Sequence, residues 1–382
     1  MPRHPYPASA VATIKGSVYS NLAHRLETFN GERFPLHVGD TWMEPADGCR
    51  MQDLLVTEYP GMHRYTSPHG MPLLLDAVVE RTRARTGVAT ERDDVLIAAG
   101  ATGALGAVAG AILDPGDEVL ILAPYWPLIE GIVRAVRAVP VAVPFLDVED
   151  AASAVEAVRR AFTAKTAALY LSTPNNPSGR LIPRSTVQAL VEWAAGHGLW
   201  ILSDEVYEDY VYEGEHTPAR PLAPERVFAV HSFSKAYGMA GNRCGYVVGP
   251  REVMGELRKI ATHTFYATPT ASQIAAARAL SGLGSAWVHN ARSKYAEIGR
   301  RTAERLRLPV PQGSTFLFLD VADHLDARGI TGFLERAVEQ GVLLAPGSSF
   351  GPYPTHLRLC FTAIPPEATA RGVEILAGLL GY

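Results

Sequence analysis

The sequence predicts an α/β fold, in which a large, mostly parallel sheet is covered by helices on both faces and followed by a smaller α+β domain. Short apolar runs alternate with longer amphipathic stretches as far as Ser281, as expected for strands joined by crossover helices. Several of these runs are apolar without alternation, which is typical of strands buried on both faces. After Ser281 the pattern changes to long helices that separate strand-like segments.

The first predicted strand of the sheet is the short apolar run 95–99. A helix is predicted after it, over residues 104–113. That helix ends where Asp114, Pro115 and Gly116 form a turn signal. A further helix is predicted over residues 184–197. The remaining strands of this sheet are predicted over residues 119–122, 140–143, 167–171, 199–203, 227–230 and 245–248.

In the C-terminal part, long helical segments alternate with single strand-like segments, and this pattern predicts the smaller domain. Its elements are a helix over 286–306, a strand over 315–321, a helix over 331–340, a strand over 356–361 and a helix over 367–380. We therefore expect three parts. They are an N-terminal segment, 1–44, associated with the small domain, a large domain, 45–283, and a small C-terminal domain, 284–382.

Length and composition bound the possible functions. The chain has 382 residues, 47% of them hydrophobic, which suits two domains with sizeable cores. A net charge of -4 provides no basic field, so we expect no nucleic-acid partner. No apolar run approaches membrane-spanning length, and we expect no membrane partner. The three cysteines form no close pair, which argues against a metal site and for a reducing cytoplasm.

The stretch Ser232-Phe233-Ser234-Lys235, followed eight residues later by Arg243, combines an amine nucleophile with groups suited to a phosphate. A lysine can form an imine with an aldehyde, and two hydroxyls with a guanidinium can hold a phosphate beside it. These residues suggest pyridoxal 5'-phosphate as a covalently held cofactor. Taken alone, a serine-rich turn with a lysine is more often a solvated loop.

Ligands of open parallel sheets collect at the carboxyl ends of the strands, so the residues after each apolar run are candidate site residues. Gly100, Ala101 and Thr102 follow the first strand, where small residues let backbone N–H groups approach a phosphate. A plain tight turn is the alternative. Asp204 follows residues 199–203 and is expected to be buried with a partner, such as the N–H of a protonated pyridine ring, or to be a helix N-cap.

Three further residues could contact the same ring. Tyr207 and the amide of Asn176 could donate hydrogen bonds to its phenolic oxygen. The indole of Trp126, held between two prolines, could lie flat on the ring. Core packing and rigid turns are the alternatives for each of them.

The chain resembles the class I and II aminotransferases of the fold-type I pyridoxal-phosphate enzymes, over nearly its whole length. The order of the matching motifs along the chain is that of the family. They are Tyr65 with Gly70, Gly100-Ala101-Thr102, Pro124-Tyr125-Trp126, Asn175-Asn176-Pro177-Ser178-Gly179, Ser203-Asp204-Glu205-Val206-Tyr207, Ser232 to Lys235, Arg243 and Arg358.

This resemblance implies a role for each matched residue. Lys235 would form the imine, Asp204 would meet the ring nitrogen, and Trp126 would stack on the ring. Asn176 and Tyr207 would hold the phenolic oxygen. The residues implied around the phosphate are Gly100, Ala101, Thr102, Ser232, Ser234, Arg243 and, from a second subunit, Tyr65, which implies a homodimer. Arg358 would bind the substrate carboxylate, and Gly39 would let the N-terminal segment cover the site.

The resemblance implies an aminotransferase that moves an amino group from an L-amino acid to a 2-oxo acid by a ping-pong mechanism. A C–S β-lyase that uses the same cofactor is the main alternative, and acceptor-independent release of ammonia would favour it. A regulator with an aminotransferase-like domain would need a basic segment ahead of residue 40, and none is visible. His263 stands in a stretch where some aspartate-specific relatives have an arginine, so dicarboxylate preference stays open.

Overall fold

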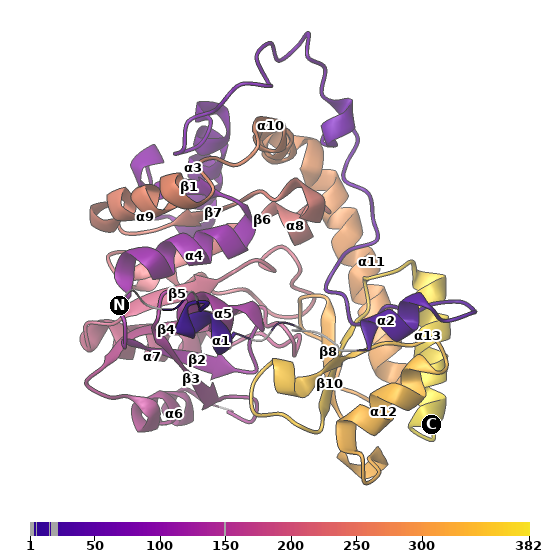
Figure 1. Cartoon of the computed structure of the whole chain (residues 1–382). Helices are drawn as coiled ribbons and strands as arrows, with labels where there is room; N and C mark the ends of the chain where they lie inside the picture. The colour runs from indigo at the N-terminus through magenta and orange to yellow at the C-terminus, as the bar shows by residue number, and fades with distance from the viewer. Residues whose placement is uncertain (1–3, 5, 15, 17–21, 149) are drawn as a thin grey trace.

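The computed structural model describes residues 4, 6–14, 16, 22–148 and 150–382, so the predicted segment 1–44 lies partly outside the described residues. Figure 1 shows a large helix-covered sheet beside a smaller sheet with its own helices, and a long helix, α11 (Gly284–Arg305), extends between them. Two short helices, α1 (Ser9–Ala12) and α2 (Ala23–Glu27), precede the large sheet. None of the helices described is both long and apolar enough to cross a bilayer.

The large sheet has seven strands in the order β1-β7-β6-β5-β4-β2-β3. Strand β7 runs antiparallel to both of its neighbours, and every other adjacent pair is parallel. The predicted mostly parallel sheet is therefore confirmed. Its strands are β1 (Val95–Ala98), β2 (Glu118–Ala123), β3 (Val139–Pro144), β4 (Thr166–Ser172), β5 (Trp200–Asp204), β6 (Val227–Ser232) and β7 (Gly245–Val248).

Helices cover both faces of this sheet, because nearly all of its strands carry apolar side chains on both sides. One face packs against α4 (Gly100–Ile112), α5 (Leu128–Ala135) and α9 (Arg251–Thr264). The other face packs against α6 (Ala151–Ala161) and α7 (Arg184–Gly196), and, at its β1 end, against α3 (Pro72–Thr86) and α10 (Thr270–Arg278). Of these seven helices, only α4 and α7 were predicted with defined bounds from the sequence.

The smaller sheet is antiparallel, in the order β8-β10-β9. Its core includes Phe34 and Leu36 from the N-terminal segment together with Tyr207 and Tyr210 from the turn after β5, so both parts of the chain contribute to it. The elements of this part are α11, β8 (Phe316–Asp320), α12 (Gly329–Val338), β9 (Ala345–Pro346), β10 (His356–Cys360) and α13 (Pro366–Leu379). The predicted C-terminal helices and strands agree with these bounds to within a few residues.

One boundary differs in a way that matters for the site. Helix α4 begins at Gly100, four residues before the predicted start, so Gly100, Ala101 and Thr102 form its first turn. Gly100 has a φ of 70°, and a Cβ there would lie 2.6 Å from Nη2 of Arg243. Glycine is therefore required for the guanidinium to approach the start of the helix.

Candidate active site

A cavity of about 240 Å³ lies where the carboxyl ends of the central strands meet the smaller part of the chain. It is lined by side chains from β5, β6 and β10 and by the first turn of α4. Twelve of the predicted site residues lie on its wall. They are Gly39, Ala101, Thr102, Trp126, Asn176, Asp204, Tyr207, Ser232, Ser234, Lys235, Arg243 and Arg358.

Lys235 reaches the cavity from the one-turn helix α8 (Phe233–Ala236), which directly follows β6. Ser232 caps this helix, because its Oγ accepts a hydrogen bond from the Ser234 N–H at 3.1 Å. The lysine Nζ donates to the backbone carbonyl of Gly39 and lies 3.8 Å from Oδ1 of Asp40. Burial lowers the pKa of Lys235 below its ordinary value, which favours the neutral, nucleophilic amine.

The first turn of α4 and the residues after β6 form a cradle suited to a phosphate. The helix has 13 residues, and its N-terminus presents N–H groups toward the cavity wall formed by Ala101 and Thr102. Arg243 is held by a hydrogen bond from Nη1 to the Ala240 carbonyl at 2.9 Å. A Cβ on Gly245 would lie 2.9 Å from the Ala101 nitrogen, so glycine lets β7 pass close beneath this turn. Hydroxyls, a guanidinium and a helix N-terminus together match a phosphate group.

Asp204, the last residue of β5, is buried at the cavity wall. Its Oδ2 accepts a hydrogen bond from the Tyr170 hydroxyl at 2.6 Å, and its Oδ1 lies 3.4 Å from the Val206 nitrogen. Burial raises the pKa of Asp204 to about 6, although the Tyr170 hydrogen bond opposes this shift. Tyr170 was not predicted as a site residue. The available signal was one tyrosine within the apolar run 167–171 of β4.

Replacement of Asp204 by asparagine is expected to stabilise the cofactor-free protein. The pKa of Asp204 rises from 3.8 to about 6 on folding. The folded state therefore binds more protons than the unfolded state between these values, and its stability falls as pH rises through that window. The neutral amide of the Asp204→Asn variant would avoid this cost and still accept from Tyr170, so the free energy of unfolding should increase by about 3 kcal/mol at pH 8. Denaturant unfolding at matched protein concentration measures this. Equal or lower stability of the variant at pH 8 would contradict it.

Arg358, on β10, is buried between the rings of Phe316 and Phe350, whose centroids lie 4.4 and 4.7 Å from its Cζ. Its Nη1 donates to Oδ1 of Asn176 at 3.1 Å, and its Nη2 donates to the His37 carbonyl at 2.6 Å. Burial, assisted by Arg358, lowers the pKa of His37 to about 4, so this imidazole adds no second positive charge near pH 7. Because Oδ1 of Asn176 accepts from Arg358, the NH₂ group is the part of the Asn176 amide that can donate to a ligand.

The two aromatic residues predicted to contact the ring differ in their burial. Tyr207 is buried and meets Phe316 edge to face, with ring centroids 5.7 Å apart. Burial raises the pKa of Tyr207, so its phenol stays protonated and can donate. Trp126 is half-buried at the turn that joins β2 to α5. Both side chains line the cavity, on walls formed by different elements.

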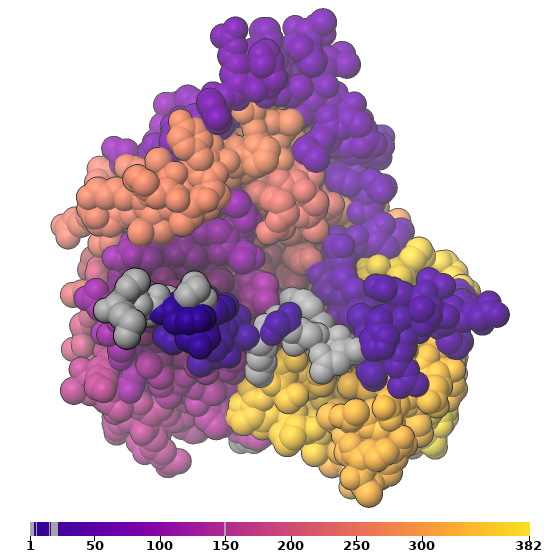
Figure 2. Space-filling view, in the orientation of Figure 1, coloured from indigo at the N-terminus to yellow at the C-terminus, as the bar shows by residue number. Residues whose placement is uncertain are grey.

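Two residues considered in the sequence analysis lie away from this cavity. Tyr65 is 91% exposed, and its ring packs edge to face against Tyr266. It belongs to the segment between Met51–Asp53 and α3, which projects from one end of the molecule (Figure 2). His263 is exposed near the end of α9, where its Nδ1 contacts the Lys259 carbonyl at 2.8 Å. In the described chain, the cations on the cavity wall are Lys235, Arg243 and Arg358.

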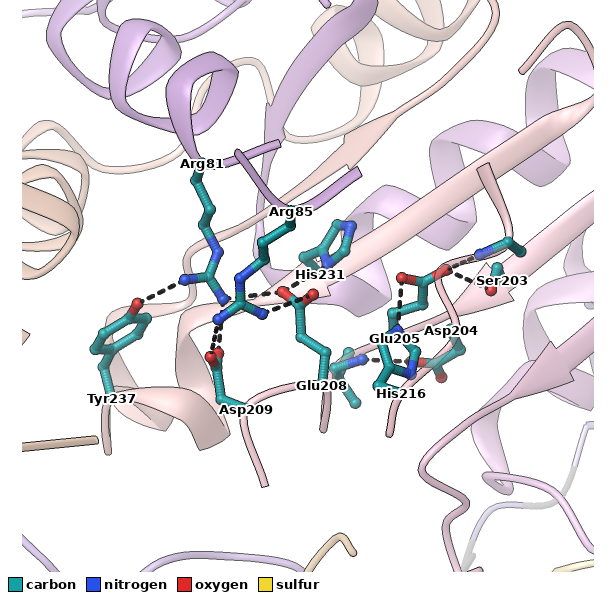
Figure 3. Close-up of polar contacts among 12 residues, drawn as sticks. Arg81, Arg85, Ser203, Asp204, Glu205, Glu208, Asp209, His216, His231 and Tyr237 are labelled. Atoms are coloured by element: carbon teal, nitrogen blue, oxygen red, sulfur yellow. Dashed lines mark hydrogen bonds and ion pairs between the residues drawn. The ribbon is translucent and has the colours of Figure 1, made fainter. Parts of the chain in front are cut away.

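A buried ionic network supports the turn that follows Asp204 (Figure 3). Arg81 and Arg85 extend from α3 and bind Glu208 at 2.9 Å each. Arg81 also binds Asp209 at 2.7 Å, and Arg85 contacts the same carboxylate. Both acidic side chains are almost fully buried, so their removal would leave uncompensated arginines. The network thus anchors Glu208 and Asp209, in the turn after Asp204, to α3.

The comparisons with known proteins agree with this geometry. The sequence matches the family "Aminotransferase class I and II" over residues 49–376. It is 34% identical over 332 residues to an aspartate/prephenate aminotransferase of Thermus thermophilus, which covers 84% of each chain. It is 33% identical over 309 residues to an arginine–pyruvate transaminase of Pseudomonas aeruginosa, which covers 78% of each. The solved structure of an aspartate aminotransferase from Thermus thermophilus with maleate is similar with a TM-score of 0.89 and 29% identity, over 98% of this chain and 100% of that one.

Proposed function

The chain belongs to the class I and II aminotransferases and is an amino-acid transaminase, and we propose that Lys235 is its catalytic amine and that pyridoxal 5'-phosphate is its cofactor. The observation that carries the proposal is the meeting of three groups on one small cavity. These are the buried amine of Lys235, the buried carboxylate of Asp204 and the phosphate cradle around Arg243. Each group lies on a different element, and one phosphorylated aldehyde could satisfy all three.

The residues present fit this cofactor. Bound here, pyridoxal phosphate would supply an aldehyde that condenses with amines and a ring that accepts electron density from the substrate Cα. Asp204 would accept the hydrogen bond of the protonated ring nitrogen, while Asn176 and Tyr207 would donate to the phenolic oxygen. Trp126 would cover one ring face. The phosphate would be held by Thr102, Ser232, Ser234, Arg243 and the N–H groups that begin at Gly100 and Ala101.

The remaining groups would act on the substrate. Arg358 would bind the α-carboxylate of the amino acid through its two terminal nitrogens, and its aromatic sandwich would keep the guanidinium plane fixed. Once displaced by the incoming amine, Nζ of Lys235 would remove the Cα proton and return it during the transfer. Gly39 leaves room at this point, since a Cβ there would lie 3.1 Å from the Phe316 ring. A 2-oxo acid would leave, and a second 2-oxo acid would receive the amino group.

The direct test uses the purified holoenzyme. Borohydride reduction followed by peptide mass spectrometry should locate the cofactor on Lys235. Single amino acids added without acceptor should each convert at most one equivalent of bound cofactor to its amine form, and sustained turnover should require a 2-oxo acid. An adduct on another lysine, or continued ammonia release without acceptor, would contradict the proposal.

We further propose a homodimer in which Tyr65 contacts the phosphate bound by its partner subunit. The support is the high exposure of Tyr65 on a projecting segment, away from the cavity of its own chain. Exposed apolar side chains accompany it, among them Leu55 and Val56, as expected of a surface that a second copy covers. The cytoplasmic location and the division into residues 1–44, 45–283 and 284–382 stay predictions.

Mixed dimers test the proposed role of Tyr65. Tyr65→Phe should lower kcat/KM by about tenfold, because a hydrogen bond to a charged phosphate is lost. A dimer of one Tyr65→Phe chain and one Lys235→Ala chain, isolated with two different tags, should then have one intact site and about half of the wild-type activity. If Tyr65 acted within its own chain, neither site would be intact. The mixed dimer would then have at most about half of the Tyr65→Phe activity, and the proposal would fail.

A further inference from the structure

Tyr170 carries the only polar side-chain atom between residues 167 and 171 of β4. Its ring is fully buried in the core between the large sheet and α4. In the strand register Ser172 lies opposite Asp204, and Tyr170 precedes Ser172 by two residues. The long side chain of Tyr170 therefore extends along the strand to reach the carboxylate. The resulting hydrogen bond, 2.6 Å from the hydroxyl to Oδ2, joins two neighbouring parallel strands at the cavity.

The two oxygens of the Asp204 carboxylate have unequal partners. Oδ2 accepts the short bond from Tyr170, whereas the contact of Oδ1 with the Val206 nitrogen, at 3.4 Å, is long for a hydrogen bond. A carboxylate has about four acceptor positions, so capacity for a further donor remains. The carboxylate is thus fixed through one oxygen and can accept another bond, and Asp204 lines the cavity.

We propose that Tyr170 is a positioning residue for transamination, whose hydroxyl holds the Asp204 carboxylate in the orientation that the ring N–H of the cofactor requires. This inference rests on the proposed function of Asp204. Hydrogen bonds from a hydroxyl to a carboxylate are shorter and stronger than neutral ones, and the Tyr170 bond lies in that range. The bond keeps the carboxylate from rotating.

A purely structural role would have a different signature. Every buried tyrosine hydroxyl needs an acceptor, and the acceptor is often a backbone carbonyl, as for Tyr212, whose hydroxyl donates to the carbonyl of Ser314. Loss of such a bond affects stability alone. If Tyr170 acts through Asp204, loss of its hydroxyl must change cofactor binding and the chemical step as well.

The test compares Tyr170→Phe with the matched variant Tyr212→Phe in the full-length protein. The measurements are the dissociation constant of pyridoxal phosphate from the cofactor-free protein, the visible circular dichroism of the bound cofactor, and kcat and KM. Tyr170→Phe should raise the dissociation constant about tenfold, lower kcat about tenfold and alter the dichroism band, with KM for the amino acid changed less than about twofold. Tyr212→Phe should leave all of these quantities near their wild-type values.

A double-variant cycle decides whether the effect passes through Asp204. In the Asp204→Ala background, Tyr170→Phe should change the dissociation constant and kcat by less than about twofold. A tenfold change in that background, or wild-type values for Tyr170→Phe alone while Asp204→Ala is impaired, would overturn the proposal. A wild-type protein that takes up no pyridoxal phosphate would instead overturn the proposed function itself.

Discussion

Lys235→Ala is expected to abolish transamination, with turnover reduced by at least about 10⁴-fold. The buried Nζ of Lys235, with its lowered pKa, is the amine placed on the cavity wall to attack an aldehyde and to move the substrate Cα proton. Alanine can do neither. The internal imine absorbance in the visible range should disappear, whereas the phosphate cradle around Arg243 should still bind the cofactor, more weakly and without a covalent bond. Steady-state assays and absorbance spectra of the variant measure both effects.

Lys259→Ala supplies the control for the loss of a lysine. Lys259 lies on the exposed face of α9 and pairs with Glu256, so this variant should retain wild-type turnover and absorbance. Near-normal transamination by Lys235→Ala would refute the assignment of this residue as the catalytic amine.

Much of the candidate site could be predicted because its polar and ionisable residues closely follow apolar runs. Asp204, Asn176 and Thr102 each lie at or just beyond the end of a strand, and parallel strands bring such positions to one edge of a sheet. The strands themselves were predictable because they are buried on both faces. Local sequence patterns were therefore sufficient to predict both the fold class and one wall of the cavity.

The parts that could not be predicted depend on contacts distant in sequence. From the sequence alone Tyr170 is an ordinary core residue, because only the strand register shows that it lies beside Asp204. The carbonyls of His37 and Gly39 have no side-chain signature, yet they accept from Arg358 and Lys235. Helix α3 was missed in the sequence analysis, although its arginines anchor the turn after β5. Hydrophobic periodicity contains no information on such tertiary pairs.

Arg358→Leu should lower kcat/KM for amino acids by about 10³-fold while leaving cofactor binding nearly unchanged. The guanidinium lies between Phe316 and Phe350 in a buried setting, where loss of one partner of a charged pair costs about 2–5 kcal/mol. A loss of about 4 kcal/mol, which lies within that range, corresponds to the stated factor. Arg358→Lys keeps the charge but not the planar guanidinium, so kcat/KM should fall less in this variant, by about 10²-fold.

A primary amine that matches a good amino-acid substrate but lacks the α-carboxylate gives the decisive comparison. The wild-type enzyme should strongly prefer the amino acid, because only that substrate engages the terminal nitrogens of Arg358. In Arg358→Leu the preference should largely disappear, since the amine never used the guanidinium and the amino acid now presents an unpaired carboxylate to an apolar pocket. An Arg358→Leu enzyme that retains the wild-type preference would show that the carboxylate is bound elsewhere. The bonds of Arg358 to the Asn176 amide and the His37 carbonyl would then serve to hold β10 against the segments that carry these two residues.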